Sequence, residues 1–192
     1  HYICSIHFYM RYTEYYANSK KHLLATLSIL DSFNKKKEQI SKYTLLELYY
    51  LSGYILEGAV VFLAYKMGNW TEKDDIKDVC NVAFTATTSL DFYRNGNRKT
   101  HKKLGNKYFI QYHAFQPIVK NLLRPNSAFD AIPYIGVSCP IDPDVESLID
   151  NWNPRFRYVY EDTQVPSELN EDSLRRLLNT CRDIMILTFS AI

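Results

Sequence analysis

Apolar side chains recur at steps of three and four residues between Arg11 and about Gln39, and lysines and Asp31 fill the positions between them. This spacing brings the apolar side chains to one face of a helix. It therefore predicts a long amphipathic helix. The recurring apolar residues are Tyr16, Leu23, Leu24, Leu27, Leu30 and Phe33.

The longest apolar run of the chain covers residues 45–65. Ser41 or Thr44 can cap a helix at the start of this run, because a side-chain oxygen there accepts a hydrogen bond from a free backbone N–H. The Gly-Asn pair at 68–69 is expected to end the helix at about residue 67. The run therefore predicts a second long helix.

This second helix is long enough to cross a bilayer, but Glu47 and Glu57 interrupt it, and a carboxylate is costly in hydrocarbon. We therefore expect a core helix and no membrane partner. Gly53, Gly58 and Ala59 place small residues in a bulky run, which lets a neighbouring backbone approach closely. These residues predict that the helix is central to the fold.

The middle of the chain is less regular. Helical spacing predicts a short helix over 74–84, and the β-branched and polar residues after it predict a loop to about residue 100. A further helix is expected over 104–123, kinked or divided at Pro117. Prolines and a glycine crowd residues 124–143, and their density excludes a long helix there.

A strong apolar ladder predicts the last helix, with Ser167 as its expected N-cap and a short helix over 145–151 before it. Together the elements predict an all-α fold: an up-and-down bundle of four or five long helices with two irregular insertions, at about 68–100 and 124–143. The ladder consists of Leu174, Leu177, Leu178, Cys181, Ile184, Met185 and Thr188.

Composition favours a single folded domain. The chain has 192 residues, of which 46% are hydrophobic and 15% aromatic. Division into two domains would leave each half with a thin core. We therefore expect one domain over residues 1–192. The four cysteines form no Cys-x-x-Cys pair, so the usual zinc and redox spacings are missing, and we expect no metal and no cofactor. No secretory signal is visible, which makes the cytoplasm the expected compartment.

Three segments on this helical pattern resemble the HEPN family. They are residues 15–23 (YYANSKKHL), residues 50–57 (YLSGYILE), and Arg157-Tyr158 followed by the long last helix. A fourth piece, THKKL at 100–104, is similar to the start of the third helix of that family. The resemblance implies a bundle that dimerises and that associates with RNA, nucleotides or a nucleotidyltransferase partner in defence and toxin-antitoxin systems.

Many HEPN proteins are metal-independent ribonucleases with an Arg-x4-6-His site that is completed by dimerisation. Arg94, Asn95 and His101 match this pattern here. An imidazole can move a proton of the ribose 2′-hydroxyl or of the leaving 5′-oxygen, while a guanidinium holds the phosphate. One hypothesis is therefore an endoribonuclease.

The other hypothesis is a HEPN-like module that binds RNA or a nucleotide-handling partner without cutting it. In that case Thr100 caps a helix and His101 is only a residue of its first turn. The net charge of +2 favours no class of partner by itself, so the distribution of charge matters more than the total.

The clearest charge cluster surrounds the same motif, because no acidic residue lies between Phe92 and Gln111. Cations neutralise the phosphate backbone, and aromatic rings stack on unpaired bases. The cluster therefore predicts a surface for single-stranded RNA, with a solvated helix face as the alternative. The predicted nucleic-acid-binding residues are Arg94, Arg98, Lys99, Lys102, Lys103, Lys107 and Tyr108.

Acidic residues are concentrated between Asp142 and Asp172. They form either a surface that faces the basic cluster in an assembly or an ordinary solvated surface. His22 and His113 are expected on helices, each without a partner, because nothing nearby in the sequence supplies further metal ligands.

Glu57 is a carboxylate on an otherwise apolar helix, so its burial requires a partner. A guanidinium pairs with a carboxylate through two hydrogen bonds, and we therefore predict a structural ion pair with Arg157, or with Arg155 as the second candidate. The catalytic alternative pairs Glu57 with a histidine or with Tyr54 as a general base.

Overall fold

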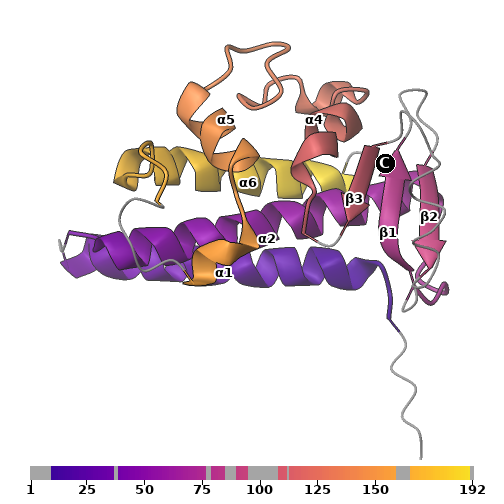
Figure 1. The fold of residues 1–192 in the computed structure, drawn as a ribbon, viewed down its shortest axis with the longest axis horizontal. Coiled ribbons are helices and arrows are strands. Elements are labelled where there is room, and N and C mark those ends of the chain that lie inside the picture. The colour runs from indigo at the N-terminus through magenta and orange to yellow at the C-terminus, as the bar shows by residue number, and fades with distance from the viewer. Residues whose placement is uncertain are drawn as a thin grey trace, which may run out of the picture.

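A computed structural model describes residues 10–36, 39–76, 79–84, 90–94, 108–111, 113–158 and 165–190, and for the three strands at 79–84, 90–94 and 108–111 it describes the backbone only. Three long helices lie side by side, two short helices cover them on one side, and a small sheet lies at one end of the bundle (Figure 1).

The bundle is built on helices α1 (Thr13–Lys36), α2 (Lys42–Met67) and α6 (Glu171–Ser190). α1 and α6 are antiparallel, because the Tyr16 ring lies 4.9 Å from the Phe189 ring at one end and Arg175 donates to Asn34 at the other. α2 packs against both and runs parallel to α6, and Lys66 near its end donates to the Phe189 carbonyl.

α2 is the buried centre of the fold, as the sequence predicted. Ser41 accepts a hydrogen bond from the Thr44 N–H and caps the helix, and Gly68 ends it. Within the described residues, α2 is the one helix long and apolar enough to span a membrane by length and composition, and 83% of its apolar window is buried inside the protein. Its apolar surface is thus covered by α1, α6, the short helix α4 (Gln116–Leu123) and the 3-10 helix η2 (Pro154–Tyr158).

Two glycines of α2 permit close approaches. At Gly58 a Cβ atom would lie 2.7 Å from the Tyr15 carbonyl oxygen, so α1 and α2 touch through their backbones there. Ser19 of α1 uses this proximity and donates to the Ile55 carbonyl at 2.6 Å. At Gly53 a Cβ atom would lie 1.9 Å from Cε2 of Trp152.

The sheet consists of β1 (Val79–Phe84), β2 (Leu90–Arg94) and β3 (Tyr108–Gln111), in the order β2-β1-β3 with both pairs antiparallel. The helix predicted over 74–84 is therefore wrong at 79–84, the loop predicted up to about residue 100 is wrong at 90–94, and the helix predicted over 104–123 is wrong at 108–111. β-Branched and aromatic residues are frequent in these segments and favour strands, and a short apolar run does not distinguish a strand from a buried helix.

Helix α4 (Gln116–Leu123) begins where the sequence predicted a kink, because Pro117 occupies its first turn, where no backbone N–H is needed. Residues 124–142 contain only the short 3-10 helix η1 (Ser127–Phe129), as their proline content predicted, and helix α5 (Pro143–Asp150) follows. The last described element before α6 is the 3-10 helix η2 (Pro154–Tyr158).

The helical-bundle architecture is thus confirmed, with three long helices and two short ones in the described part of the chain. The N-cap of α6 differs from the prediction. Asn170, not Ser167, accepts the hydrogen bond from the Ser173 N–H, and the Ser173 hydroxyl accepts from the Asn170 N–H in return. This reciprocal pair starts the helix three residues later than expected.

Substitution of Gly53 by Ala should destabilise the fold, because the added methyl group overlaps the Trp152 ring. The ring cannot move away freely, since its Nε1 donates to the Tyr50 carbonyl at 3.1 Å. Overpacking of this kind costs about 1–3 kcal/mol, measurable by urea unfolding. Ser28→Ala on the exposed face of α1 is the control and should change stability by less than about 0.5 kcal/mol. Equal unfolding midpoints for Gly53→Ala and the parent would show that Trp152 does not constrain α2.

Candidate functional site

The predicted basic cluster is described only at its two ends, through the backbones of Arg94 and Tyr108. Arg94 ends β2 and pairs with Val79, whereas Tyr108 begins β3 and pairs with Phe84. These partners are the two ends of β1, so the structure does not bring Arg94 and Tyr108 together. The other predicted site residues, Asn95, Arg98, Lys99, His101, Lys102, Lys103 and Lys107, lie outside the described residues.

The sheet register places a different histidine, His113, at the end of the sheet where β2 stops. Asn81 of β1 pairs with Tyr93 of β2 on one side and with Gln111 of β3 on the other. The last residues of β2 and β3 therefore lie at the same end of the sheet. Two strand spacings separate their backbones there, about 10 Å. His113 follows Gln111 by two residues and therefore lies near the end of the sheet where β2 stops.

His113 pairs with Glu57 of α2. The distance between His113 Nδ1 and Glu57 Oε2 is 2.9 Å, and the side chains are 47% and 14% exposed. His113 is therefore neither alone nor on a helix, since it lies in the turn between β3 and α4. The predicted ion pair between Glu57 and Arg157 is not formed, because Arg157 is exposed and instead donates to the Tyr158 hydroxyl.

Aromatic side chains from α2 and from the segment after α5 surround this pair. The Tyr54 ring meets the His113 ring edge-on at 5.5 Å and the Trp152 ring at 5.3 Å. The Tyr50 hydroxyl donates to the Tyr54 hydroxyl at 3.1 Å. Tyr50, Tyr54 and Glu57 are spaced by four and three residues, so they lie on one face of α2. Glu57 and Tyr54 contact the histidine directly, and Tyr50 contacts Tyr54.

Burial is the main influence on the titration of this cluster. It raises the pKa of the Glu57 carboxyl, and the hydrogen bond and charge of His113 only partly oppose the effect. Burial also raises the pKa of Tyr54, together with the hydrogen bond from Tyr50, so the phenol stays protonated at neutral pH. His22 of α1 packs its ring 5.7 Å from Tyr54, and burial lowers its pKa.

A groove with a volume of about 490 Å³ opens beside His113. The guanidinium of Arg155 is the cation among the described residues that line it. Gln116, the first residue of α4, also lines the groove, so the positive end of that helix dipole lies at the groove. The lining comes from two segments: His113, Ala114 and Gln116 before and in α4, and Trp152, Asn153, Pro154 and Arg155 after α5.

Gln116 and Asn153 fix the shape of this groove. The Gln116 side chain donates from Nε2 to the Trp152 carbonyl at 2.5 Å and joins the two lining segments. Asn153 accepts a hydrogen bond from the Arg155 N–H through Oδ1 at 2.8 Å, which starts the η2 turn. The wall that carries Arg155 is therefore tied to the wall that carries His113.

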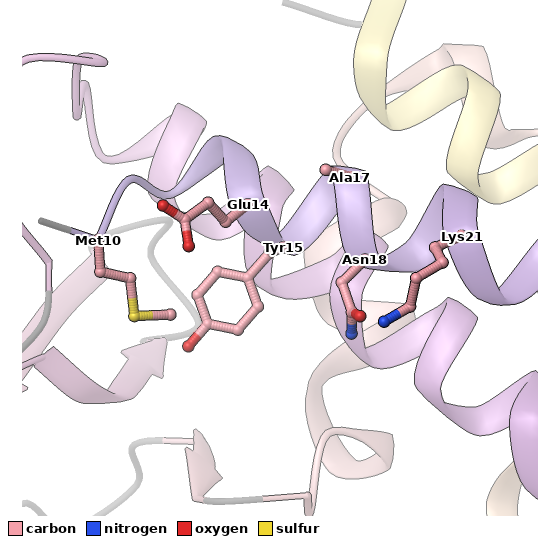
Figure 2. Close-up of a pocket in the computed structure, with 6 residues that line it drawn as sticks. All are labelled: Met10, Glu14, Tyr15, Ala17, Asn18 and Lys21. Carbon is pink, nitrogen blue, oxygen red and sulfur yellow. The ribbon is translucent and has the colours of Figure 1, made fainter. Parts of the chain in front are cut away.

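A second cavity, of about 430 Å³, lies along α1 (Figure 2). Figure 2 shows that its lining side chains come from α1 and from Met10 just before it, with Met10 and Lys21 at opposite ends of the row and Glu14 next to Met10. The Glu14 carboxylate accepts a hydrogen bond from the Arg11 N–H. Its charged groups do not converge on one point, so this cavity is the weaker candidate.

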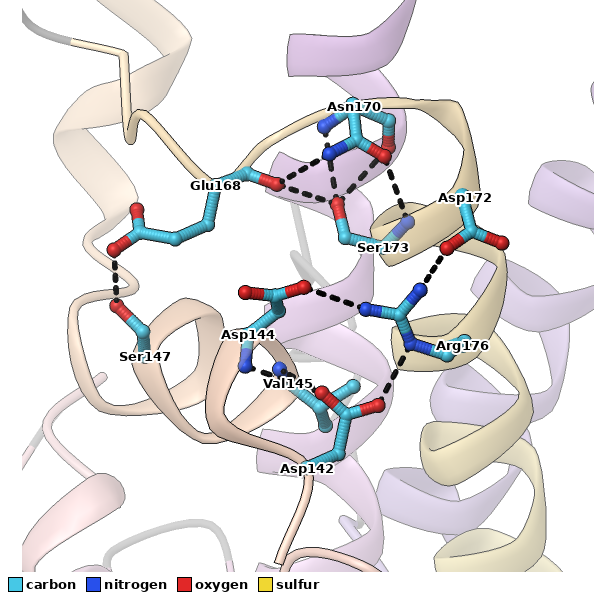
Figure 3. Close-up of polar contacts among 9 residues, drawn as sticks. All are labelled: Asp142, Asp144, Val145, Ser147, Glu168, Asn170, Asp172, Ser173 and Arg176. Carbon is cyan, nitrogen blue, oxygen red and sulfur yellow. Dashed lines mark hydrogen bonds and ion pairs between the residues drawn. The ribbon is translucent and has the colours of Figure 1, made fainter.

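The acidic segment is used largely within the protein (Figure 3). Asp142 caps α5 by accepting from the Asp144 and Val145 N–H groups, and Arg176 of α6 contacts Asp142, Asp144 and Asp172. Although partial burial raises the pKa of Asp142, the hydrogen bonds from Arg176 and the α5 backbone outweigh it and lower that pKa. These carboxylates dock α5 on α6 and do not present a free acidic face.

Comparison of the chain with protein-family models, curated proteins and solved structures finds no match. The similarity to HEPN proteins therefore rests on the sequence segments given above and stays a prediction. In the described ranges, no group of three or more His, Cys, Asp and Glu side chains is placed to hold a metal ion.

Sequence reasoning named Glu57 and the possibility of a histidine partner, but it missed His113 as that partner. The two residues are 56 positions apart, and His113 was expected on a helix that is not formed. The signal available in the sequence was the polar stripe of Tyr50, Tyr54 and Glu57 on an apolar helix.

Glu57→Gln should raise the melting temperature at pH 8 and leave it unchanged at pH 3.5. The folded-state pKa of Glu57 lies above its ordinary value of 4.5, so folding disfavours the ionised form. This cost is absent below the unfolded-state pKa and grows as the pH rises through the folded-state pKa. Each kcal/mol recovered corresponds to about 2–4 °C for a chain of this size.

Glu47→Gln is the matched control for this thermal-melting experiment, because Glu47 is exposed on the same helix. It should shift the melting temperature at neither pH. A lower melting temperature of Glu57→Gln at pH 8 would instead make the Glu57–His113 contact a stabilising ion pair.

Proposed function

We propose that this protein is a HEPN-like helical module that binds single-stranded RNA through the segment 94–107 and the groove beside His113. The observation that carries the proposal is the density of cations in that segment, with no acidic residue between Phe92 and Gln111. A polyanion gains affinity from such a segment because each phosphate contact releases counterions.

Two features of the described part support this assignment. Arg94, the first residue of the segment, lies at the end of the sheet where β3 also stops. From there β3 continues to His113, which lines the groove together with Arg155. The described carboxylates near α5 and the start of α6 are engaged by Arg176, Lys120 and other groups of the chain. They are therefore poor candidates to neutralise the basic segment.

The resemblance to HEPN proteins adds further proposals: a second copy of the chain as a partner, a nucleotidyltransferase as another, and a cytoplasmic role in defence or toxin-antitoxin systems. The ribonuclease alternative with Arg94, Asn95 and His101 also follows from the resemblance. These assignments depend on the sequence segments and on the family pattern.

The double substitution Lys102→Glu/Lys103→Glu should weaken binding of a single-stranded RNA by at least about tenfold in a filter-binding assay, because it reverses two charges in the proposed contact. The parent should lose about 50-fold in affinity between 50 and 200 mM salt if it makes about four phosphate contacts. A salt-independent affinity would contradict the phosphate contacts.

Lys35→Glu/Lys36→Glu is the matched control. It changes the same charge at the end of α1 remote from the sheet, where both lysines are exposed (Figure 1). Its net charge equals that of the Lys102→Glu/Lys103→Glu variant, and its RNA affinity should stay within about twofold of the parent. Equal losses from the two double variants would show that binding depends on net charge alone and would exclude a specific basic segment.

A further inference from the structure

The contact between Glu57 and His113 has the form of a proton-transfer pair. Glu57 occupies Nδ1, so Nε2 is the nitrogen left for another partner, and it has no hydrogen-bond partner among the described residues. A carboxylate on Nδ1 fixes the tautomer that accepts protons at Nε2, and it stabilises the imidazolium that results.

The exposure of the two residues supports this role. Glu57 is only 14% exposed on a helix that is otherwise apolar, whereas His113 is 47% exposed and lines the groove. A surface ion pair contributes little to stability and needs no buried member. A buried carboxylate that holds a solvent-facing imidazole is the arrangement that a reacting histidine requires.

The groove next to His113 suits an anion. Arg155 lines it, the positive end of α4 lies at it, and Gln116 ties its two walls together. A guanidinium forms two parallel hydrogen bonds with a phosphate group. A phosphate bound by Arg155 would lie in the same groove as the imidazole of His113.

The described lining of the groove contains no serine, threonine, cysteine or lysine that could serve as a nucleophile. A reaction at the phosphate therefore needs either water or a nucleophile that belongs to the ligand. RNA provides one, because the ribose 2′-hydroxyl is adjacent to its own phosphodiester.

We infer that the groove is a catalytic site for RNA, in which His113 acts as the general base, Glu57 orients it, and Arg155 binds the phosphate. This rests on the proposed binding of RNA. Nε2 of His113 takes the 2′-hydroxyl proton, the 2′-oxygen forms a bond to phosphorus, and the bond from phosphorus to the 5′-oxygen breaks. Water protonates the leaving 5′-oxygen, and the imidazolium returns its proton to solvent. The product ends in a 2′,3′-cyclic phosphate.

The test uses a 5′-labelled single-stranded RNA of mixed sequence and a copy of the same strand with 2′-deoxyribose throughout, in buffer with EDTA. The parent should cleave the first strand to cyclic-phosphate ends and leave the second intact. His113→Ala should slow cleavage by about 100-fold or more while RNA is still retained on the filter. Imidazole added to His113→Gly should restore part of the rate.

Glu57 is a positioning residue, so Glu57→Gln should lower kcat by about tenfold with little change in KM, whereas Arg155→Ala should mainly raise KM. His22→Ala is the matched control, because this histidine packs on Tyr54 without lining the groove. Its cleavage rate should equal that of the parent. Thermal melting of each variant checks that the fold is kept.

The outcomes separate the two proposals. RNA binding without cleavage by the parent would overturn the catalytic site and leave the binding function standing. Failure to bind RNA at all would overturn the binding function. Cleavage that survives His113→Ala but is lost in His101→Ala would overturn the role of His113 and support the Arg94–His101 motif.

Discussion

Burial of α2 on nearly all sides is the constraint on which the other elements depend. The helix is apolar around its whole circumference, so it is stable in water only when other elements surround it. α1 approaches at Gly58, α6 covers a further side, and Trp152 fits over Gly53. The irregular segment after α5 is thus part of the core, because it supplies the tryptophan that closes the remaining face.

That same face of α2 contains the exception to its apolar character. Tyr50, Tyr54 and Glu57 follow one another at helical spacing on either side of Gly53. The Trp152 ring occupies the space that a side chain at Gly53 would fill. The packing of this face of α2 therefore also determines the position of Glu57. Trp152 both seals the core and forms a wall of the groove, so the geometry of the candidate site is inherited from the hydrophobic core.

The sequence predicted the elements whose pattern is long. The bounds of α1 and α2 were predicted to within a few residues. The predicted end of α2 at residue 67 was correct, because Gly68 caps the helix and Asn69 after it has a positive φ. The strands were missed because segments of four to six residues are too short for their period to be decided, and they are stabilised by partners distant in the chain. The Glu57–His113 pair was missed because it too joins residues distant in the chain: His113 reaches α2 only through the position of β3.

The pairing of Glu57 with His113 also bears on the role of a carboxylate at this position. An apolar residue at 57 would complete the buried surface of α2 and remove the cost that raises the pKa of the carboxyl. Arg157, the partner that would have neutralised Glu57 permanently, lies instead against Tyr158 at the surface. The fold therefore leaves the carboxylate to a group that can gain and lose a proton in contact with solvent. The proposed catalytic site requires such an oriented imidazole beside the groove, whereas a purely structural carboxylate would pair as well with a permanently charged guanidinium.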